Sequence, residues 1–417
     1  MRLLKGRPVG MFLFVLLLSA LCALSRAQDD VVCSAGFGSF DAESTTHVTL
    51  LVGAPKQQSG LANRACQAKL RWNNQALLIV PEAWQVDVDL MGADLGFKTP
   101  VAALQIRQTV ADPLMRYEIY SLAKPPIKLR NLSDGDYFRA EDTNLDGQIE
   151  IWTHDAGAAS GFENIPLSAF DFPPAMALRF EKQRLMDVSA EFPSRFDSQI
   201  ATLRAQLDPS DLNRFKNSDG KLSSAADLSG NALRGLMSAK IKALEIVWSY
   251  LYSGREREAW QALAELWPAS DMDRIRTAIL DARAHGIHSQ VDAVSSGPPA
   301  RRKRRVMIYD MATQYVDALG NQESSGRIFE ISQADIQPMP IFFRRPPPPD
   351  NAPATDLNKE VVVDMVIDSA GKVWSIKAVG ETDKDLIDAS AQWKFIPALK
   401  LGRPVATRLR LGVTPFQ

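Results

Sequence analysis

The carboxyl-terminal stretch of this 417-residue chain constrains its fold most, because it spells out one complete small unit. Residues 361–368 are rich in valine and isoleucine, which favours a half-buried strand, and residues 368–371 (Asp-Ser-Ala-Gly) are typical of a tight turn. Apolar residues at helical spacing follow over 386–393, and apolar and polar residues alternate over 405–411. We therefore predict a ββαβ unit within residues 358–417.

This unit resembles the C-terminal domain of TonB-type energy transducers. The resemblance covers residues 358–416 and depends on five short motifs, namely Ile367-Asp368, Gly371-Lys372-Val373, Leu386-Ile387-Asp388-Ala389-Ser390, Trp393-Lys394-Phe395-Ile396-Pro397-Ala398 and Gly402-Arg403-Pro404-Val405. In that family the edge of the final strand accepts an extended segment of an outer-membrane receptor, which is β-strand addition. The resemblance implies that the binding edge here is formed by Val405, Thr407, Leu409, Leu411 and Val413.

The amino-terminal residues predict export. Arg2, Lys5 and Arg7 precede an uncharged, mostly apolar run over 8–25, and small residues surround a cleavage position after Ala27. This order is typical of a secretory signal peptide over residues 1–27, which would place the protein in the periplasm or elsewhere in the bacterial cell envelope. An uncleaved inner-membrane anchor is the alternative.

Cleavage would leave two cysteines, Cys33 and Cys66. An even count in an exported protein indicates a disulfide, and two unrelated thiols are the other interpretation. The formal net charge of −1 gives no overall field that would recruit nucleic acid.

Residues 28–192 alternate short apolar runs with Gly, Pro, Asn and Asp, which predicts an all-β domain. One stretch within it has oxygen-bearing side chains at the spacing of a calcium loop, with Gly147 at the bend. It resembles the calcium loops of FG-GAP-type β-propeller repeats, although a single copy is present. The predicted ligands for Ca²⁺ are Asp142, Asn144, Asp146, Glu150 and the carbonyl of Gln148. A plain Asp-Gly turn between strands is the alternative.

Residues 193–290 predict a helical domain, because apolar residues recur every three or four positions, as at Leu244, Trp248 and Leu251. Part of this region resembles a TPR-like hairpin, but a solenoid needs several such repeats. Residues 291–357 contain a run of five basic residues and a run of four prolines, which predicts a basic, Pro-rich linker.

The sequence therefore predicts a multidomain α+β protein with an N-terminal all-β domain, a central helical domain and the C-terminal ββαβ unit. It contains no HExxH, GxSxG or P-loop motif, so we expect an interaction protein and not an enzyme. The expected activity is binding of a protein partner by strand addition. Two alternatives remain: an energy transducer for TonB-dependent transmembrane transport, or a periplasmic enzyme or carbohydrate-binding protein with its site in the β domain.

Overall fold

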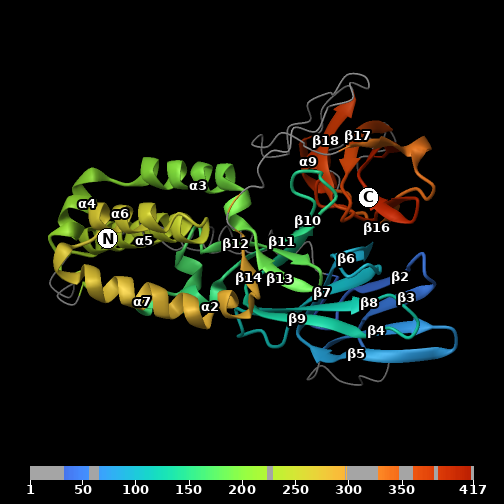
Figure 1. The fold of residues 1–417 in the computed structure, drawn as a ribbon, viewed down its shortest axis with the longest axis horizontal. Helices are drawn as coiled ribbons and strands as arrows, with labels where there is room; N and C mark the ends of the chain where they lie inside the picture. The colour runs from blue at the N-terminus through green and yellow to red at the C-terminus, as the bar shows by residue number, and fades with distance from the viewer. Residues whose placement is uncertain are drawn as a thin grey trace, which may run out of the picture.

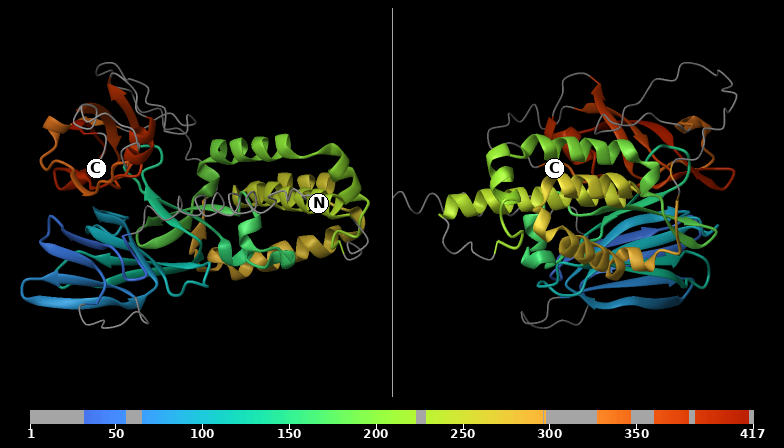
Figure 2. Two further views of the ribbon diagram at one scale, coloured as in Figure 1. Left: turned by 180° about the vertical axis from the view of Figure 1, so that it is seen from behind. Right: turned by 60° about the vertical axis from the view of Figure 1, so that its left-hand side comes forward.

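The computed structural model of the chain describes residues 32–55, 65–222, 229–295, 297, 327–346, 360–379 and 384–414. The expected signal peptide and the basic run at 301–305 lie outside these residues. The described chain has a mixed α+β fold. Helices gather at one end of the molecule, while the N-terminal strands and the C-terminal unit occupy the other end (Figures 1 and 2).

The N-terminal strands form a sandwich of two antiparallel sheets. One sheet has the order β2-β3-β4-β5, with strands Ser39–Glu43, Val48–Gly53, Cys66–Trp72 and Gln75–Ala83. The other has the order β1-β6-β7-β8-β9, with strands Cys33–Ser34, Gln85–Ala93, Val101–Arg107, Met115–Ser121 and Lys128–Gly135. Alternate side chains of both sheets meet in one apolar core. The expected cysteine pair is bonded at this core, with an S–S distance of 2.09 Å between Cys33 and Cys66.

A third sheet connects the sandwich to the helices. Its order is β10-β11-β12-β13-β14, with strands Phe138–Glu141, Glu150–His154, Ala175–Glu181, Arg184–Asp187 and Ala293–Val294. Strand β14 pairs in parallel with β13, so the beginning of the expected linker belongs to this sheet.

The helical region follows the predicted periodicity. The helices are α3 (Pro193–Gln206), α4 (Pro209–Lys216), α5 (Gly230–Tyr252), α6 (Glu256–Leu266) and α7 (Met272–His285), with the short α2 (Ala156–Ala159) before them. Leu244, Trp248 and Leu251 are buried, as their spacing predicts. These side chains share one apolar core with the third sheet and with one face of the sandwich. Over the described residues, therefore, the β-rich and helical regions are packed around a common interior.

The C-terminal unit, residues 360–414, has the expected order of elements with three short strands added. It contains β17 (Val361–Ile367), β18 (Val373–Val379), α9 (Lys384–Ser390), β19 (Lys394–Ile396), β20 (Ala398–Lys400), β21 (Arg403–Val405) and β22 (Thr407–Val413). We call this unit the C-terminal module. Gly371 has a φ of +82°, and a Cβ there would lie 1.9 Å from the Phe395 carbonyl oxygen, so the turn requires glycine. Trp393 and Phe395 lie in the core of the module.

Residues 327–346, expected to be linker, lie along the C-terminal module. They contain β15 (Phe329–Glu330), the short 3₁₀ helix η7 (Ile331–Gln333) and β16 (Met339–Phe342). Strand β15 pairs with β22, and β16 pairs with β19. We call residues 327–346 the strap. Short apolar segments within a Pro-rich stretch account for this pairing, since they supply strands that can add to an open edge.

Among the helices that the structure describes, none has both the length and the apolar character needed to cross a membrane.

Candidate functional site

The sheet of the C-terminal module has the order β15-β22-β17-β18, so β22 has one well-paired side and one largely open side. Toward β17 it is paired along its whole length, from Thr407 opposite Ile367 to Val413 opposite Val361. On its other side, only Thr407 and Arg408 are paired with a described strand, β15. No other strand of the described chain pairs with the rest of this outer edge, Leu409–Val413, and a strand edge of this kind can accept main-chain hydrogen bonds from an added strand.

The predicted binding residues fall on this edge with two corrections. Val405 lies in β21 and pairs with Ala398, so it is not part of β22. Thr407 and Val413 are buried, and Leu409 and Leu411 pack against the core of the module. The side chains of the predicted residues thus support the strand from within, and an added strand would meet their main chain.

The sequence prediction also assumed that the edge was wholly unpaired, and the structure corrects this. Phe329 lies opposite Thr407 and Glu330 lies opposite Arg408, with the two strands running in parallel. The Phe329 amide donates to the Ala406 carbonyl oxygen at 2.9 Å. One end of the edge is therefore occupied by the chain's own strap.

The solvent-facing side of β22 is basic. Arg408 Nε donates to Asp364 Oδ1 at 2.8 Å, and Arg410 donates to the same carboxylate at 3.3 Å. These hydrogen bonds, from Arg408 above all, lower the pKa of Asp364. Two guanidinium groups share one carboxylate here, and Glu330 of the strap approaches Arg408 at 3.9 Å. The edge thus favours an added strand that carries an acidic side chain.

The predicted calcium loop lies between β10 and β11 and folds around its own carboxylates. The Gly147 amide donates to Asp142 Oδ2 at 3.0 Å, the Asp146 amide to Asn144 Oδ1 at 3.1 Å, and the Gln148 amide to Asp146 Oδ1 at 2.8 Å. Burial raises the pKa of Asp142 to about 7. Its Oδ1 atom is buried and has no hydrogen-bond partner.

Glu150, the predicted ligand at position 9 of the loop, has other partners. Its carboxylate accepts from the Thr143 amide at 3.2 Å and lies 3.3 Å from Arg179 Nη1. Burial raises the pKa of Glu150 to about 8. Among the described residues, no three His, Cys, Asp or Glu side chains converge as metal ligands. The remaining oxygens that fit a hard cation are those of Asp142, Asn144, Asp146 and the Gln148 carbonyl.

The same loop contacts the turn between β17 and β18. The Asp142 amide donates to Asp368 Oδ2 at 2.8 Å, and the Ser369 hydroxyl donates to Asp142 Oδ2 at 2.8 Å. The indole Nε1 of Trp374 donates to the Thr143 carbonyl oxygen at 3.1 Å. The loop therefore connects the β-rich region to the C-terminal module.

Two buried ion pairs extend this contact. Lys372 Nζ lies 2.5 Å from Asp89 Oδ1, and Lys394 Nζ lies 3.0 Å from Asp87 Oδ2. Burial alone would raise the pKa of Asp89, but the charges of Lys372 and Lys394 lower it overall, while burial lowers the pKa of Lys372. The Tyr117 hydroxyl donates to Asp89 as well, at 2.6 Å. We call this interface the docking seam; its polar residues are Asp87, Asp89, Asp142, Asp368, Ser369, Lys372 and Lys394.

The sequence analysis missed the docking seam. Lys372 and Lys394 are part of the motifs that resemble the TonB family, and their contacts with residues some 300 positions away cannot be recognised from local pattern. A signal was present in Asp87 and Asp89, which alternate with apolar residues in a fully buried strand. Two carboxylates in such a strand require buried cationic partners.

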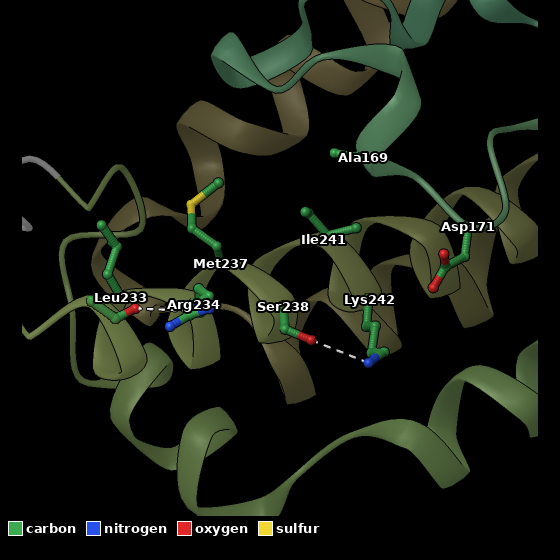
Figure 3. Close-up of a pocket in the computed structure, with 9 residues that line it drawn as sticks. Ala169, Asp171, Leu233, Arg234, Met237, Ser238, Ile241 and Lys242 are labelled. Carbon is green, nitrogen blue, oxygen red and sulfur yellow. Dashed lines mark hydrogen bonds between the residues drawn. The ribbon is translucent and has the colours of Figure 1, made fainter. Parts of the chain in front are cut away.

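A pocket of about 520 Å³ lies on α5, lined by Leu233, Met237 and Ile241 with the charged groups of Arg234 and Lys242 (Figure 3). Its polar groups bond locally, since Lys242 donates to Ser238 at 3.1 Å and Arg234 to Asn231 at 2.6 Å. Asp171 also lines the pocket, so its wall carries one carboxylate beside the Ser238 hydroxyl and the two cationic groups.

Comparisons of the chain with protein-family models, with curated proteins and with solved structures find no match.

Proposed function

We propose that this chain is an exported cell-envelope interaction protein whose C-terminal module binds an extended partner segment by strand addition to β22. The observation that carries the proposal is the partly open outer edge of β22, beside a strand of the chain that already pairs with it. In this proposal the regions of the chain have different roles. Residues 358–417 are the TonB-like binding module, while the β-rich region (28–192) and the helical region (193–290) form its scaffold.

Hydrogen exchange tests this proposal. Extended peptides would be selected from a random displayed library against the full chain, and exchange would be measured with and without a selected peptide. We expect slower exchange over Leu409–Val413, because an added strand protects the outward amides of β22. The matched control is β18, the opposite edge of the same sheet. Protection confined to β18 or to the α5 pocket would contradict strand addition at β22.

The two alternative functions receive less support. An energy transducer needs a membrane anchor, and the first 31 residues are outside the described chain. N-terminal sequencing of the mature protein decides this point, since an intact Met1 in the membrane fraction supports the anchor. For an enzyme site in the β domain, Asp87 and Asp89 are not available, because they are buried beneath the C-terminal module and paired with its lysines.

We also propose that Ca²⁺ binds the loop of Asp142, Asn144 and Asp146, with the Gln148 carbonyl. The supporting observation is the buried Oδ1 atom of Asp142, which has no partner. Binding to the folded state stabilises it, so we expect the midpoint of thermal unfolding to fall when EGTA is added. The variant Asp146→Asn, at an exposed position, should fold normally and lose most of this difference. An equal midpoint with and without chelator in the native chain excludes the site.

A further inference from the structure

The strap follows the C-terminal module from its sheet edge to its core, beside the last strands of the chain (Figures 1 and 2). Strand β15 pairs with the start of β22. Ile336 and Leu399 then form an isolated antiparallel β-bridge. The Leu399 amide donates to the Ile336 carbonyl oxygen at 2.9 Å, and the Ile336 amide donates to the Leu399 carbonyl oxygen at 3.2 Å. Strand β16 pairs with β19, and the Phe343 ring stacks on Trp393 with a centroid distance of 3.8 Å.

Where it meets β22, the strap binds in the way that we propose for a partner. Strand β15 of the strap runs parallel to β22 and is joined to it through the main chain. The hydrogen bond from the Phe329 amide to the Ala406 carbonyl oxygen is an example. Glu330 adds a carboxylate 3.9 Å from Arg408, and the Lys400 ammonium lies 5.9 Å from the Phe329 ring centroid. An aromatic residue followed by an acidic residue is therefore the pair that this end of the edge accommodates.

The strap lies on the surface of the C-terminal module, and its side chains are only partly covered. Not one of its side chains is buried, and Ile336 and Met339 remain 45% and 44% exposed. The Glu330 side chain that faces Arg408 is 61% exposed, and ion pairs of such exposure contribute little to stability. Only two residue pairs join β15 to β22. Ile328, directly before β15, is half-buried against the small apolar cluster of Leu145, Val366, Trp374 and Ala406, so separation of this end of the strap uncovers that cluster and leaves the main core of the module closed.

We propose that β15 is a displaceable intramolecular ligand of the β22 edge. The partner is an extended peptide segment that runs parallel to β22, places an aromatic and an acidic residue where Phe329 and Glu330 lie, and continues along Leu409–Val413. This inference rests on the proposed function, because it assigns the competitor and the partner chemistry of the same edge. Since the competitor is tethered, it acts at a high effective concentration and excludes weakly binding segments.

The probe for this proposal is a fluorescein-labelled peptide with the sequence of residues 327–334, Arg-Ile-Phe-Glu-Ile-Ser-Gln-Ala. Its binding to the full chain is followed by fluorescence anisotropy. We expect the double variant Phe329→Ala/Glu330→Ala to bind the peptide at least tenfold more tightly than the native chain, because its own competitor is weakened. The matched control is Ser332→Ala/Gln337→Ala, two exposed strap positions outside the paired strands, which should bind as the native chain does.

A reversible lock supplies the opposite test. Glu330 and Arg408 lie directly opposite each other, so Glu330→Cys/Arg408→Cys can form a disulfide that fixes β15 to β22. Because Arg408→Cys removes the cation that faces Glu330 of the peptide, the reduced double variant is the reference for the oxidised one. We expect the reduced form to bind the peptide more weakly than the native chain and the oxidised form to lose this binding, with each single cysteine variant insensitive to oxidation. The native disulfide between Cys33 and Cys66 is buried in the sandwich core and is common to all these proteins.

The outcomes separate the two proposals. If a library-selected peptide slows hydrogen exchange of β22 equally in the oxidised and reduced forms of Glu330→Cys/Arg408→Cys, β15 is not a displaceable ligand. Strand addition to β22 is supported in that case. If neither the strap peptide nor a selected peptide binds the strap-weakened variant at β22, both proposals fail. A tenfold gain on weakening, together with loss on locking, is the result expected of a displaceable strand.

Discussion

The C-terminal module is held to the rest of the chain at two places that differ in construction. At the docking seam, the buried Asp89 carboxylate accepts from Lys372, and the buried Asp368 carboxyl, whose pKa burial raises to about 8, accepts from a main-chain amide. At the strap, the side chains are exposed or half-buried, and the paired strands are short. Because buried charges without partners are costly while exposed pairs contribute little, the seam is suited to permanent attachment and the strap to exchange.

This difference also bears on how the module could work. A binding domain at the end of a long tether searches the space around it, whereas this module sits on the sandwich, with Ile396 in the sandwich core. Its β18 and β22 edges are therefore fixed relative to the scaffold, and under our proposal β15 is the part that moves. A partner would then come to the edge, and the module would not extend toward the partner.

The largest expected effect comes from breaking the docking seam at Lys372. The variant Lys372→Met leaves the Asp89 carboxylate buried without its cation, which costs about 3–5 kcal/mol of folding free energy. Urea unfolding measures this loss. The control Lys377→Met changes an exposed lysine on β18, the strand that begins directly after Lys372, and should stay within about 0.5 kcal/mol of the native chain.

A second variant, in which Asp89 is also replaced by a neutral residue, completes this test. In Lys372→Met/Asp89→Asn no unpaired charge remains, so we expect much of the lost stability to return. If Lys372→Met alone is as stable as the control, the seam does not hold the module and the comparison with the strap loses its basis.

The next largest expected effect is a loss of folding free energy at low pH, caused by protonation of Asp89 in the docking seam. Lys372 keeps the pKa of Asp89 below 3.8 in the folded chain, so the unfolded state binds the proton more readily. The stability that this pair contributes is therefore fully present above about pH 4 and is lost as the pH falls through the lowered pKa, by at most about 1.4 kcal/mol per pH unit.

Unfolding free energies between pH 5 and pH 2.5 test this expectation. The loss on acidification should be smaller in Lys372→Met/Asp89→Asn than in the native chain, because the titrating carboxyl is gone. Equal acid slopes in the two proteins would mean that Asp89 titrates normally. The strap is joined to the sheet mainly by main-chain hydrogen bonds, which do not titrate, so acid distinguishes the two attachments.

The local sequence pattern predicted the helices and strands of the C-terminal module and of the scaffold better than it predicted the contacts between them. The turn at Gly371, the buried face of α5 and the strands of the sandwich follow from residues close in sequence. The pairing of Lys372 with Asp89 does not, because it joins residues 283 positions apart that meet only after both sheets have formed. Long-range partners of this kind are fixed by tertiary packing.

The candidate site shows the same limit. The alternation over 405–411 predicted a strand, but the residues that pair with its edge lie in a segment whose prolines and charges indicated a linker. Phe329 and Glu330 form a strand of two residues, too short for any periodicity to be recognised. An added strand takes its structure from the sheet that it joins, so its own sequence carries little signal.

The smallest expected change is in the stability of strap variants, and it sharpens the comparison most. Phe329→Ala/Glu330→Ala removes one half-buried ring and one exposed ion pair, so we expect a loss of about 1.5 kcal/mol in urea unfolding, which is the free energy that a tenfold gain in peptide affinity requires. Hydrogen exchange should nevertheless rise several-fold over Ala406–Arg408, where β15 is paired, and stay unchanged at the docking seam. A loss of 3 kcal/mol or more, with faster exchange spreading into β6, would instead show that the strap supports the whole module. The edge would then be closed by a structural strand, because an element that the fold depends on cannot be displaced by a weakly held peptide.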